Sequence, residues 1–342
     1  MKAWQFKVLR RLADGEFHSG EALARALGMS RASMWLAVRE LGAAGLEVYK
    51  VRGRGYRLAQ PLSLLDREAV LCRLGDDAAH FRIEVLDSAN STNTHAMQRA
   101  QQDVPGALVI AAEWQEAGRG RMGRTWHTGI SGALTFSLVW RFTQGVGFLS
   151  GLSLAVGVAL MRVLRALGIA EAGLKWPNDV VWRGGKLAGI LIEMQGDTLG
   201  PSTAVIGIGV NVRLSDTVRG RIDQAAADLE TACNQPLDRN ELLAMLLTEL
   251  RRVLEGFARE GLAPFRDEWQ RYHAHQDKIV TLILPDARQE RGWARGVAED
   301  GALLIETETG IRRYHSGEIS LRPGPQSSPR SAPGQPKRGV RA

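Results

Sequence analysis

Residues 116–128 read EAGRGRMGRTWHT, with three glycines and three arginines in an otherwise ordinary globular sequence. The glycines spell G-x-G-x-x-G after a predicted strand, which is the pattern of a dinucleotide-binding turn. That turn must open a helix whose N-terminus holds the pyrophosphate. Here the next residues, GISG, lead into a second strand. The sequence therefore excludes a dinucleotide-binding fold at this point and predicts a strand–loop–strand.

The loop has the composition of an anion-binding segment. Glycines let main-chain N–H groups approach an anion, and the planar guanidinium of arginine pairs with phosphate or carboxylate. We expect a loop that is mobile when empty and closes over an anionic ligand. For this stretch alone, a solvated loop and an RNA-contacting segment are the alternatives.

Strands adjoin one another on both sides of the loop. Strand-like runs occupy 81–88, 107–115 and 132–140, and a hairpin over 179–194 turns at the residues RGG. Strands that follow one another without helices favour an α+β fold with a mixed sheet over a doubly wound sheet. The other elements expected are a buried helix over 148–168, a buried strand over 203–212 and an amphipathic helix over 238–260.

Residues 15–58 are typical of a winged helix-turn-helix. Ser19 and Ser30 are predicted to cap two short helices, which two strands joined by the basic turn RGRG then follow. Residues 1–60 hold 11 Lys/Arg against 5 Asp/Glu, a net charge of +6 that indicates a nucleic-acid-binding module. A small packing domain with a solvated basic hairpin is the alternative.

Short, closely spaced strands from about residue 277 onward predict a small β-barrel. The Pro/Ser/Gly-rich end of the chain has four Lys/Arg, no acid and almost no large apolar residue, so we expect it to be disordered. The expected domains are 1–60, the DNA-binding module; 61–273, the central domain; 274–322, the barrel; and 323–342, the tail.

Composition also limits the class of protein. The chain has no run of 18 apolar residues and no signal-peptide core. Its two cysteines, Cys72 and Cys233, are far apart, and neither has metal-ligand spacing around it. We expect a reduced, cytoplasmic protein with no membrane contact and no metal site built from its own side chains.

Four more motifs indicate a ligand site on the sheet. KWPND (175–179) places a cation, an aromatic ring, a rigid turn and two polar side chains at a strand end. Lys186 begins the return strand beside the small residues Ala188-Gly189. STN (91–93) offers hydroxyls and an amide, and GIGVN (207–211) offers a strand whose backbone a ligand can approach. Each motif alone is more often structural, but together they are hard to explain as packing.

The order and spacing of these motifs resemble those of biotin–protein ligases. The resemblance runs from about Gly15 to Arg322 and, with the winged helix, is to the bifunctional type that also represses the biotin operon. It implies a class II synthetase-like catalytic domain and an SH3-like C-terminal barrel. It also implies that biotin and ATP form biotinyl-5′-AMP with Mg²⁺, and that biotin then passes to a lysine of a biotin carboxyl carrier protein. Operator DNA and a ligand-linked homodimer are the other partners that the family implies.

Site residues follow from the resemblance, position by position. The implied catalytic residues are Lys186, Arg119, Arg121 and Asp179. The implied biotin contacts are Ser91, Thr92, Gln115, Gly118, Arg119, Arg121, Trp126, Lys186 and Gly189, with Trp126 closing over the ligand. The implied nucleotide contacts are Arg119, Arg121, Asn178, Asn211, Ile222 and Arg322. The implied DNA contacts are Ser30, Arg31, Ser33, Arg39, Arg52 and Arg54.

Two departures from the family pattern affect these expectations. Ile222 stands about where the repressor type has an aromatic ring that stacks on adenine, so an apolar cover remains without stacking. Trp35 and Leu36 occupy recognition-helix positions where polar or basic side chains would face DNA. A ligand-sensing transcription factor without ligase activity is one alternative function, and a lipoate or octanoyl ligase of related fold is the other.

Overall fold

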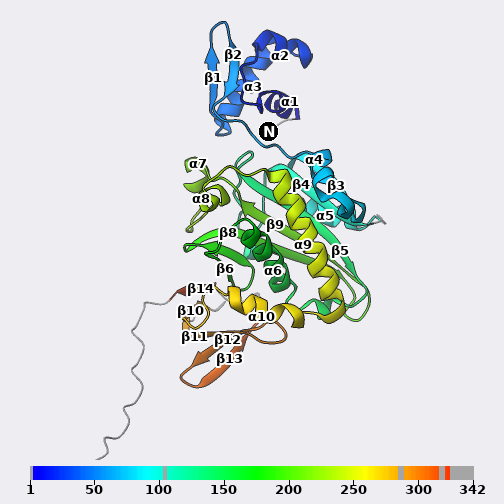
Figure 1. The fold of residues 1–342 in the computed structure, drawn as a ribbon, viewed down its shortest axis with the longest axis vertical. Coiled ribbons are helices and arrows are strands. Elements are labelled where there is room, and N and C mark those ends of the chain that lie inside the picture. The colour runs from blue at the N-terminus through cyan, green and yellow to red at the C-terminus, as the bar shows by residue number, and fades with distance from the viewer. Residues whose placement is uncertain (1–2, 103–105, 284–288, 316–319, 324–342) are drawn as a thin grey trace, which may run out of the picture.

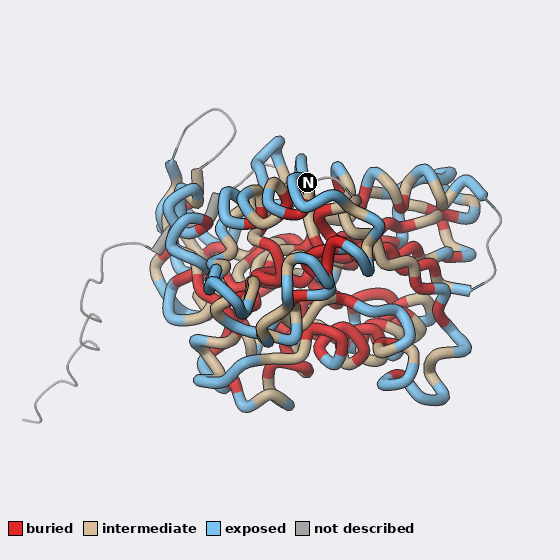
Figure 2. Tube along the Cα trace, turned by 90° about the horizontal axis from the view of Figure 1, so that it is seen from above, coloured by how far each residue is buried: buried red, intermediate tan, exposed pale blue. Residues whose placement is uncertain are grey.

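The computed structural model describes residues 3–102, 106–283, 289–315 and 320–323. The helix-turn-helix unit stands at one end of the molecule and the C-terminal strands at the other, with the large sheet between them (Figure 1). Seen from above, buried positions gather in the interior of the molecule and exposed positions lie along its outline (Figure 2). Within the described residues, no helix is both long and apolar enough to span a membrane.

The N-terminal unit has the predicted helices, caps and hairpin. Ser19 Oγ accepts from the backbone N–H of Ala22, and Ser30 Oγ accepts from that of Ser33, so each serine caps a helix as expected. Sequence reasoning missed a first helix, although its Phe6 is fully buried in the core of the unit. The elements are α1 (Ala3–Leu12), α2 (Gly20–Ala26), α3 (Arg31–Ala43), β1 (Val48–Val51) and β2 (Gly55–Leu58).

The central sheet is mixed, as predicted, with strand order β3-β4-β5-β9-β8-β7-β6. Only the pair β3–β4 is parallel among the pairings described. Its strands are β3 (Phe81–Ala89), β4 (Ala107–Gln115), β5 (Ala133–Phe142), β6 (Ala172–Lys175), β7 (Asp179–Trp182), β8 (Gly185–Gly196) and β9 (Ser202–Asn211).

Helices cover both faces of this sheet. On one face lies α5 (Thr92–Ala100), which packs on β4, β5 and β9. The other face carries α6 (Leu152–Ala166) and α9 (Arg239–Glu260), which lie side by side in Figure 1. The remaining helices are α4 (Arg67–Leu74), α7 (Asp216–Arg219), α8 (Leu229–Cys233) and α10 (Ala263–Tyr272).

The helix expected from residue 148 begins only at Leu152. A short 3₁₀ turn over Val146–Leu149 precedes it, and Gly151 adopts φ 79°. A Cβ at Gly151 would lie 2.7 Å from Leu262 Cδ2, so the close approach of α10 requires glycine there. The apolar pattern of the sequence continues through the 3₁₀ turn, so the pattern could not show where the helix begins.

A buried ion pair fastens the linker after the N-terminal unit to the sheet. The side chains of Glu113 and Arg239 are 0% and 1% exposed, and their Oε2 and Nη2 atoms lie 2.7 Å apart. Arg239 also donates to the carbonyls of Ser63 and Ala133, so its charge is paired and its donors are bonded. Removal of one partner would leave an uncompensated buried charge, which typically costs 3–5 kcal/mol.

The core of the N-terminal unit extends into the central domain. Ile130, which follows the glycine–arginine loop, is buried in the same apolar cluster as Phe6, Leu9 and Leu12. Trp114 of β4 packs against this cluster, as do linker residues near 62–64. The two units therefore share an apolar interface.

The C-terminal strands form one antiparallel sheet of order β13-β12-β11-β10-β14. Trp176 of the KWPND motif is buried, and its Nε1–H donates to the carbonyl of Gly301 at 3.0 Å, so this sheet contacts the motif directly. The tail 324–342, predicted to be disordered, lies outside the described residues. The strands are β10 (Ile279–Ile283), β11 (Gln289–Val297), β12 (Leu303–Thr307), β13 (Gly310–Tyr314) and β14 (Ser320–Pro323).

Candidate active site

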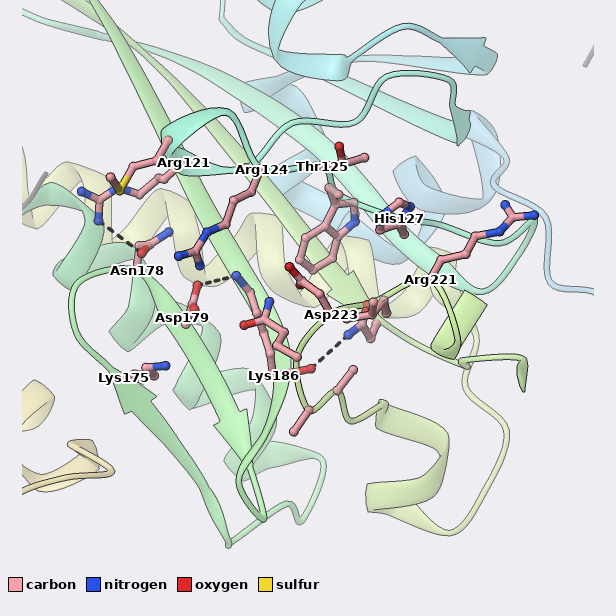
Figure 3. Close-up of a pocket in the computed structure, with 18 of the residues that line it drawn as sticks. Arg121, Arg124, Thr125, His127, Lys175, Asn178, Asp179, Lys186, Arg221 and Asp223 are labelled. Carbon is pink, nitrogen blue, oxygen red and sulfur yellow. Dashed lines mark hydrogen bonds and ion pairs between the residues drawn. The ribbon is translucent and has the colours of Figure 1, made fainter. Parts of the chain in front are cut away.

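A cavity of about 640 Å³ opens where four segments from distant parts of the chain meet. The glycine–arginine loop and KWPND line one side, and the start of β8 and the segment 221–226 line the other (Figure 3). A smaller chamber of about 50 Å³ adjoins it, between α5 and the glycines of β8 and β9. The sequence motifs that were predicted to form one site thus converge.

The glycine–arginine loop is a short antiparallel hairpin. Gly120 N–H donates to the Arg124 carbonyl at 2.7 Å, and Trp126 N–H donates to the Gly118 carbonyl at 2.8 Å. Its tip turns through Met122 and Gly123, which have φ 55° and 71°. A Cβ at Gly118 would lie 2.6 Å from the Trp126 carbonyl oxygen, whereas one at Gly120 would meet nothing closer than 3.5 Å. Gly118 is therefore the glycine on which the hairpin depends.

Lys186 is held at the rim of the cavity by the β7–β8 hairpin. Its Nζ lies 2.7 Å from Asp179 Oδ1, and both side chains are mostly buried. Its backbone N–H donates to the Ala225 carbonyl, and its own carbonyl accepts from Ala227 N–H and Asn211 Nδ2. These bonds tie the segment 221–227, most of which lines the cavity, to β8, the strand that carries Lys186.

Positive charge dominates the large cavity. Arg121 Nη1 donates to Asn178 Oδ1 at 3.3 Å, and burial lowers the pKa of the Arg121 guanidinium, although Asp179 opposes the shift. In Figure 3, Arg124 points toward the pair of Lys186 and Asp179. Five cations face two carboxylates here, which favours a polyanionic ligand; the cations are Arg121, Arg124, Lys175, Lys186 and Arg221, and the carboxylates are Asp179 and Asp223.

The small chamber is lined by connected polar groups. Gln115 Oε1 accepts from Thr92 N–H at 2.8 Å and from Thr92 Oγ1 at 3.2 Å. Behind this lining, the fully buried Ser137 donates from its Oγ to Asn93 Oδ1 at 2.6 Å. Among the described contacts, Ser91 Oγ makes no capping bond to α5, which leaves this hydroxyl for a ligand. Such a chamber suits a small polar head group.

Trp126 stands between the two spaces. A Cβ at Gly209 would lie 2.5 Å from its ring and one at Gly189 would lie 3.3 Å from it, so both glycines make room for the indole. Lys186 Nζ lies 5.7 Å from the ring centroid. Trp126 Nε1–H is buried and has no partner among the described residues. A buried donor without a partner is costly, and a ligand in the chamber would supply an acceptor.

The other implied nucleotide contacts differ in where they lie. Arg119 lines the small chamber but not the large cavity, and its Nη2 lies 3.0 Å from Glu193 Oε2. Asn211 lines the large cavity and donates to the carbonyls of Lys186 and Ala227, so it also holds the segment 221–227. Arg322 lies in β14, and its side chain lies outside the described part of the structure. Ile222 does line the large cavity, as expected.

Sequence reasoning missed three cations of the cavity, one chamber residue, and a buried serine that bonds to the chamber lining. Arg124 is the third arginine of the loop and Lys175 opens KWPND, so both stood in motifs already noted. Asn93 likewise belongs to STN. Nothing in the sequence marks Arg221 or Ser137, because only the folded chain brings them to the site.

The expected DNA contacts lie on or beside the winged hairpin and α3. Ser30 and Ser33 bond to each other at the start of α3, with their hydroxyls 2.9 Å apart. Arg31 pairs with Glu21 at 2.8 Å, and Arg39 is exposed on the same helix. Arg52 and Arg54 are exposed in the turn between β1 and β2. The basic groups therefore gather on one unit.

Comparison with known proteins finds similar chains over most of this length. The family model described as Biotin/lipoate A/B protein ligase family matches residues 85–211, and Biotin protein ligase C terminal domain matches 275–322. A model described as HTH domain matches 5–57.

Individual proteins agree with these matches. Bifunctional ligase/repressor BirA from Escherichia coli (strain K12) is 40% identical over 316 residues, 92% of this chain and 96% of that protein. Biotin--[acetyl-CoA-carboxylase] ligase from Mycobacterium tuberculosis is 32% identical over 68% of this chain and 86% of its own length. Among solved structures, the biotin protein ligase from Aquifex aeolicus in complex with biotin and ATP aligns with a TM-score of 0.60 and 27% identity. That alignment covers 71% of this chain and 99% of the other.

Proposed function

The chain belongs to the biotin–protein ligase family, in the bifunctional form with an N-terminal helix-turn-helix, and we propose how its cavity performs the ligation. A carboxylate oxygen of biotin attacks the α-phosphorus of ATP, and the bond to pyrophosphate breaks. The ε-amine of a carrier lysine then attacks the carbonyl carbon of biotinyl-5′-AMP, and AMP leaves. The observation that carries this assignment is the joining of a polar chamber to a cation-rich cavity across Trp126.

The first step must bring two anions together. At about 4 Å and an effective dielectric of 20, a pair of like charges repels by roughly 4 kcal/mol. Lys186 and Arg121 are placed to offset this repulsion where the two spaces meet, since both line each of them. Arg124 and Lys175, farther into the large cavity, are suited to the pyrophosphate that leaves.

Biotin would enter the small chamber only after Trp126 moves. A chamber of about 50 Å³ is too small for a bicyclic ring and its side chain, because ligand pockets usually enclose 300 Å³ or more. Ser91, Thr92 and Gln115 would bond the polar head group, and the indole would close over it. Ile222 would cover the adenine without stacking on it.

Asp179 is the proposed acceptor of the proton that the carrier amine loses in the second step. Its carboxylate pairs with Lys186, and that pairing would loosen once the lysine contacts phosphate. Arg119 would contact the phosphates only if its ion pair with Glu193 broke. Arg119 lines the small chamber proposed for biotin, so only its assigned role at the nucleotide requires the loop to rearrange.

Mg²⁺ fits this cavity as an ion that arrives with the nucleotide. Within the described residues, no cluster of three metal-ligating side chains occurs, whereas protein-bound Mg²⁺ commonly uses one or two carboxylates together with substrate phosphates. Asp223 also lines the cavity and has no proton assigned to it, so it is the group that would hold the ion. Bound there, Mg²⁺ would neutralise charge on the phosphates.

Docking of the carrier domain is proposed beside the loop. A groove of about 740 Å³ runs there between the loop and β8, and Met122 and Met194 are exposed along it. A carrier lysine that enters through this groove would reach the junction of the two spaces. A ligand-linked homodimer, operator binding through the N-terminal unit and a cytoplasmic location are proposed on family grounds.

One experiment separates biotin from lipoate as the substrate. Biotin-dependent exchange of labelled pyrophosphate into ATP should be rapid, and lipoate or octanoate should give none. Exchange with lipoate alone would replace the assignment with a lipoate ligase. Binding of biotin without any exchange would favour a ligand-sensing transcription factor.

A further inference from the structure

The outward face of α3 carries a large aromatic side chain where the proposed operator would lie. Met34, Ala37 and Leu41 of this helix are buried in the core of the unit. Trp35 projects elsewhere and is 48% exposed. Exposed tryptophan loses the favourable free energy of burial, so a partner that covers it would gain binding free energy.

The charges of the N-terminal unit that carries Trp35 identify the class of that partner. Residues 1–60 carry 11 Lys/Arg against 5 Asp/Glu. Arg39, one turn along α3, and Lys50, Arg52 and Arg54 of the hairpin are all exposed. A partner that meets this surface must be strongly negative over a wide area, which describes a nucleic-acid backbone and not an apolar protein face.

Trp35 and Arg39 form one unit. The Arg39 guanidinium carbon lies 5.0 Å from the centroid of the Trp35 ring, within the range of a cation–π contact. The indole restrains the arginine side chain, so less rotamer entropy is lost when the guanidinium bonds to a base or a phosphate. A similar contact holds the wing, where Arg54 lies 4.1 Å from the Phe17 ring centroid.

We propose that Trp35 reads the 5-methyl group of thymine in the major groove of the operator, with Arg39 held beside it against the adjacent base or phosphate. This inference rests on the proposed DNA binding. Recognition helices lie in the major groove, where thymine alone among the four bases offers a methyl group. The indole has a broad apolar surface and one donor, so apolar contact is the readout that it performs best. Trp35 is then a specificity-determining residue. Because it stands where the family pattern has a polar or basic side chain, the operator sequence that the helix recognises is changed.

The test starts with selection of binding sites from a random duplex pool by the full-length protein with biotin, ATP and Mg²⁺. Each thymine of the enriched site is then replaced in turn by deoxyuridine, which removes only the methyl group. We expect one position per half-site at which this change weakens binding about fourfold, the equivalent of ~0.8 kcal/mol for one buried carbon. Trp35→Ala should bind the thymine and uracil duplexes equally well.

Tyr49→Ala is the matched control, since Tyr49 is another exposed aromatic of the same unit, 40% exposed on β1. This variant should keep the preference for thymine. Thermal unfolding verifies that each variant is folded.

The outcomes distinguish a failure of the role of Trp35 from a failure of the proposed DNA binding. An enriched site at which Trp35→Ala keeps the parent's thymine preference would overturn the role of Trp35 and leave DNA binding intact. Failure to enrich any site, in a preparation that biotinylates the carrier, would overturn both. Loss of self-association by Trp35→Ala in sedimentation, with thymine preference unchanged, would make this face a protein contact instead.

Discussion

At the scale of single residues, Lys186 is the cation on which the first chemical step depends. It lines both spaces and pairs with Asp179, so its charge is already at the junction before substrates arrive. Lys186→Ala should lower biotin-dependent ATP–pyrophosphate exchange by at least 100-fold, since loss of one preorganised group at developing charge costs about 10²–10³ in rate. Exchange and thermal unfolding should be measured together.

Arg183→Ala is the control for this change. Arg183 lies in the turn of the same β7–β8 hairpin and pairs with Glu171, but it does not line the cavity. Its removal should leave exchange near the parent rate. Near-normal exchange by Lys186→Ala would remove this lysine from the mechanism.

The glycines of the loop give a second residue-scale prediction. Gly118→Ala should push Trp126 from its place, because the new Cβ would lie 2.6 Å from the Trp126 carbonyl oxygen. We expect a higher KM for biotin and faster release of biotinyl-5′-AMP, measured with labelled adenylate. Gly120→Ala meets only ordinary contacts and should behave as the parent does. Equal behaviour of the two variants would show that hairpin geometry does not govern retention.

At the scale of elements, the loop 118–126 is proposed to act as a lid. The mixed anhydride reacts with water and with amines, so it must be enclosed until the carrier arrives. Arg121→Gly should release the adenylate faster and biotinylate bystander proteins, which blotting with streptavidin would detect. If this variant labels only the carrier lysine, the loop is not a lid. That the loop is mobile when no ligand is bound also stays a prediction.

The end of α10, where the chain leads into the C-terminal sheet, should be sensitive to acid. Burial lowers the pKa of His273 from 6.5 to about 4, and the charges of His275 and Lys278 act in the same direction. The unfolded chain therefore binds this proton first as the pH falls below about 6.5. The contribution of His273 to the free energy of unfolding is complete above that pH and falls by about 2 kcal/mol at pH 5, and His275, whose pKa burial also lowers to about 4, adds to the decline.

Urea unfolding at pH 7 and pH 5 would measure this decline. His273→Gln should reduce the difference between the two free energies of unfolding, whereas His80→Gln, at an exposed position, should preserve it. An unchanged difference in the first variant would show that His273 is not the group responsible.

The elements differ in how far their sequences specify them. Strands such as β4 and β9, and the caps Ser19 and Ser30, follow from local patterns and were predicted correctly. The start of α6 was predicted wrongly, because its apolar pattern runs on through the break at Gly151. Lys186 and the loop were found through motifs. Ser137 and Arg221 could not be, since tertiary packing alone brings them to the site.

At the scale of the whole molecule, the N-terminal unit both binds DNA, as proposed, and covers part of the central domain. Sequence reasoning alone expects a chain that lacks residues 1–60 to lose DNA binding and keep most ligase activity. The structure predicts that this deletion also destabilises the central domain. Ile130 is only 4% exposed, and the deletion would remove the apolar side chains of the N-terminal unit that bury it. We expect the truncated chain to have a lower Tm and to retain adenylate less well, because Ile130 closely follows Trp126.

Ile130→Thr in the truncated chain is the variant that tests this explanation. It should reduce aggregation of the truncated chain, since it replaces an uncovered apolar group with a polar one. In the full chain the same change should destabilise the protein by about 1–3 kcal/mol, because it buries a hydroxyl in the shared core. A truncated chain with the parent's Tm and adenylate retention would show that the shared interface has no energetic role.

The most direct test of the central claim is transfer of biotin to a carrier. The full-length protein is incubated with biotin, ATP, Mg²⁺ and a biotin carboxyl carrier domain, and the carrier is analysed by mass spectrometry while AMP and pyrophosphate are measured. The account predicts one biotinyl group on one carrier lysine, with one AMP and one pyrophosphate released for each, and none of these products from Lys186→Ala. An unmodified carrier and no AMP, in a preparation that still binds biotin, would contradict the account.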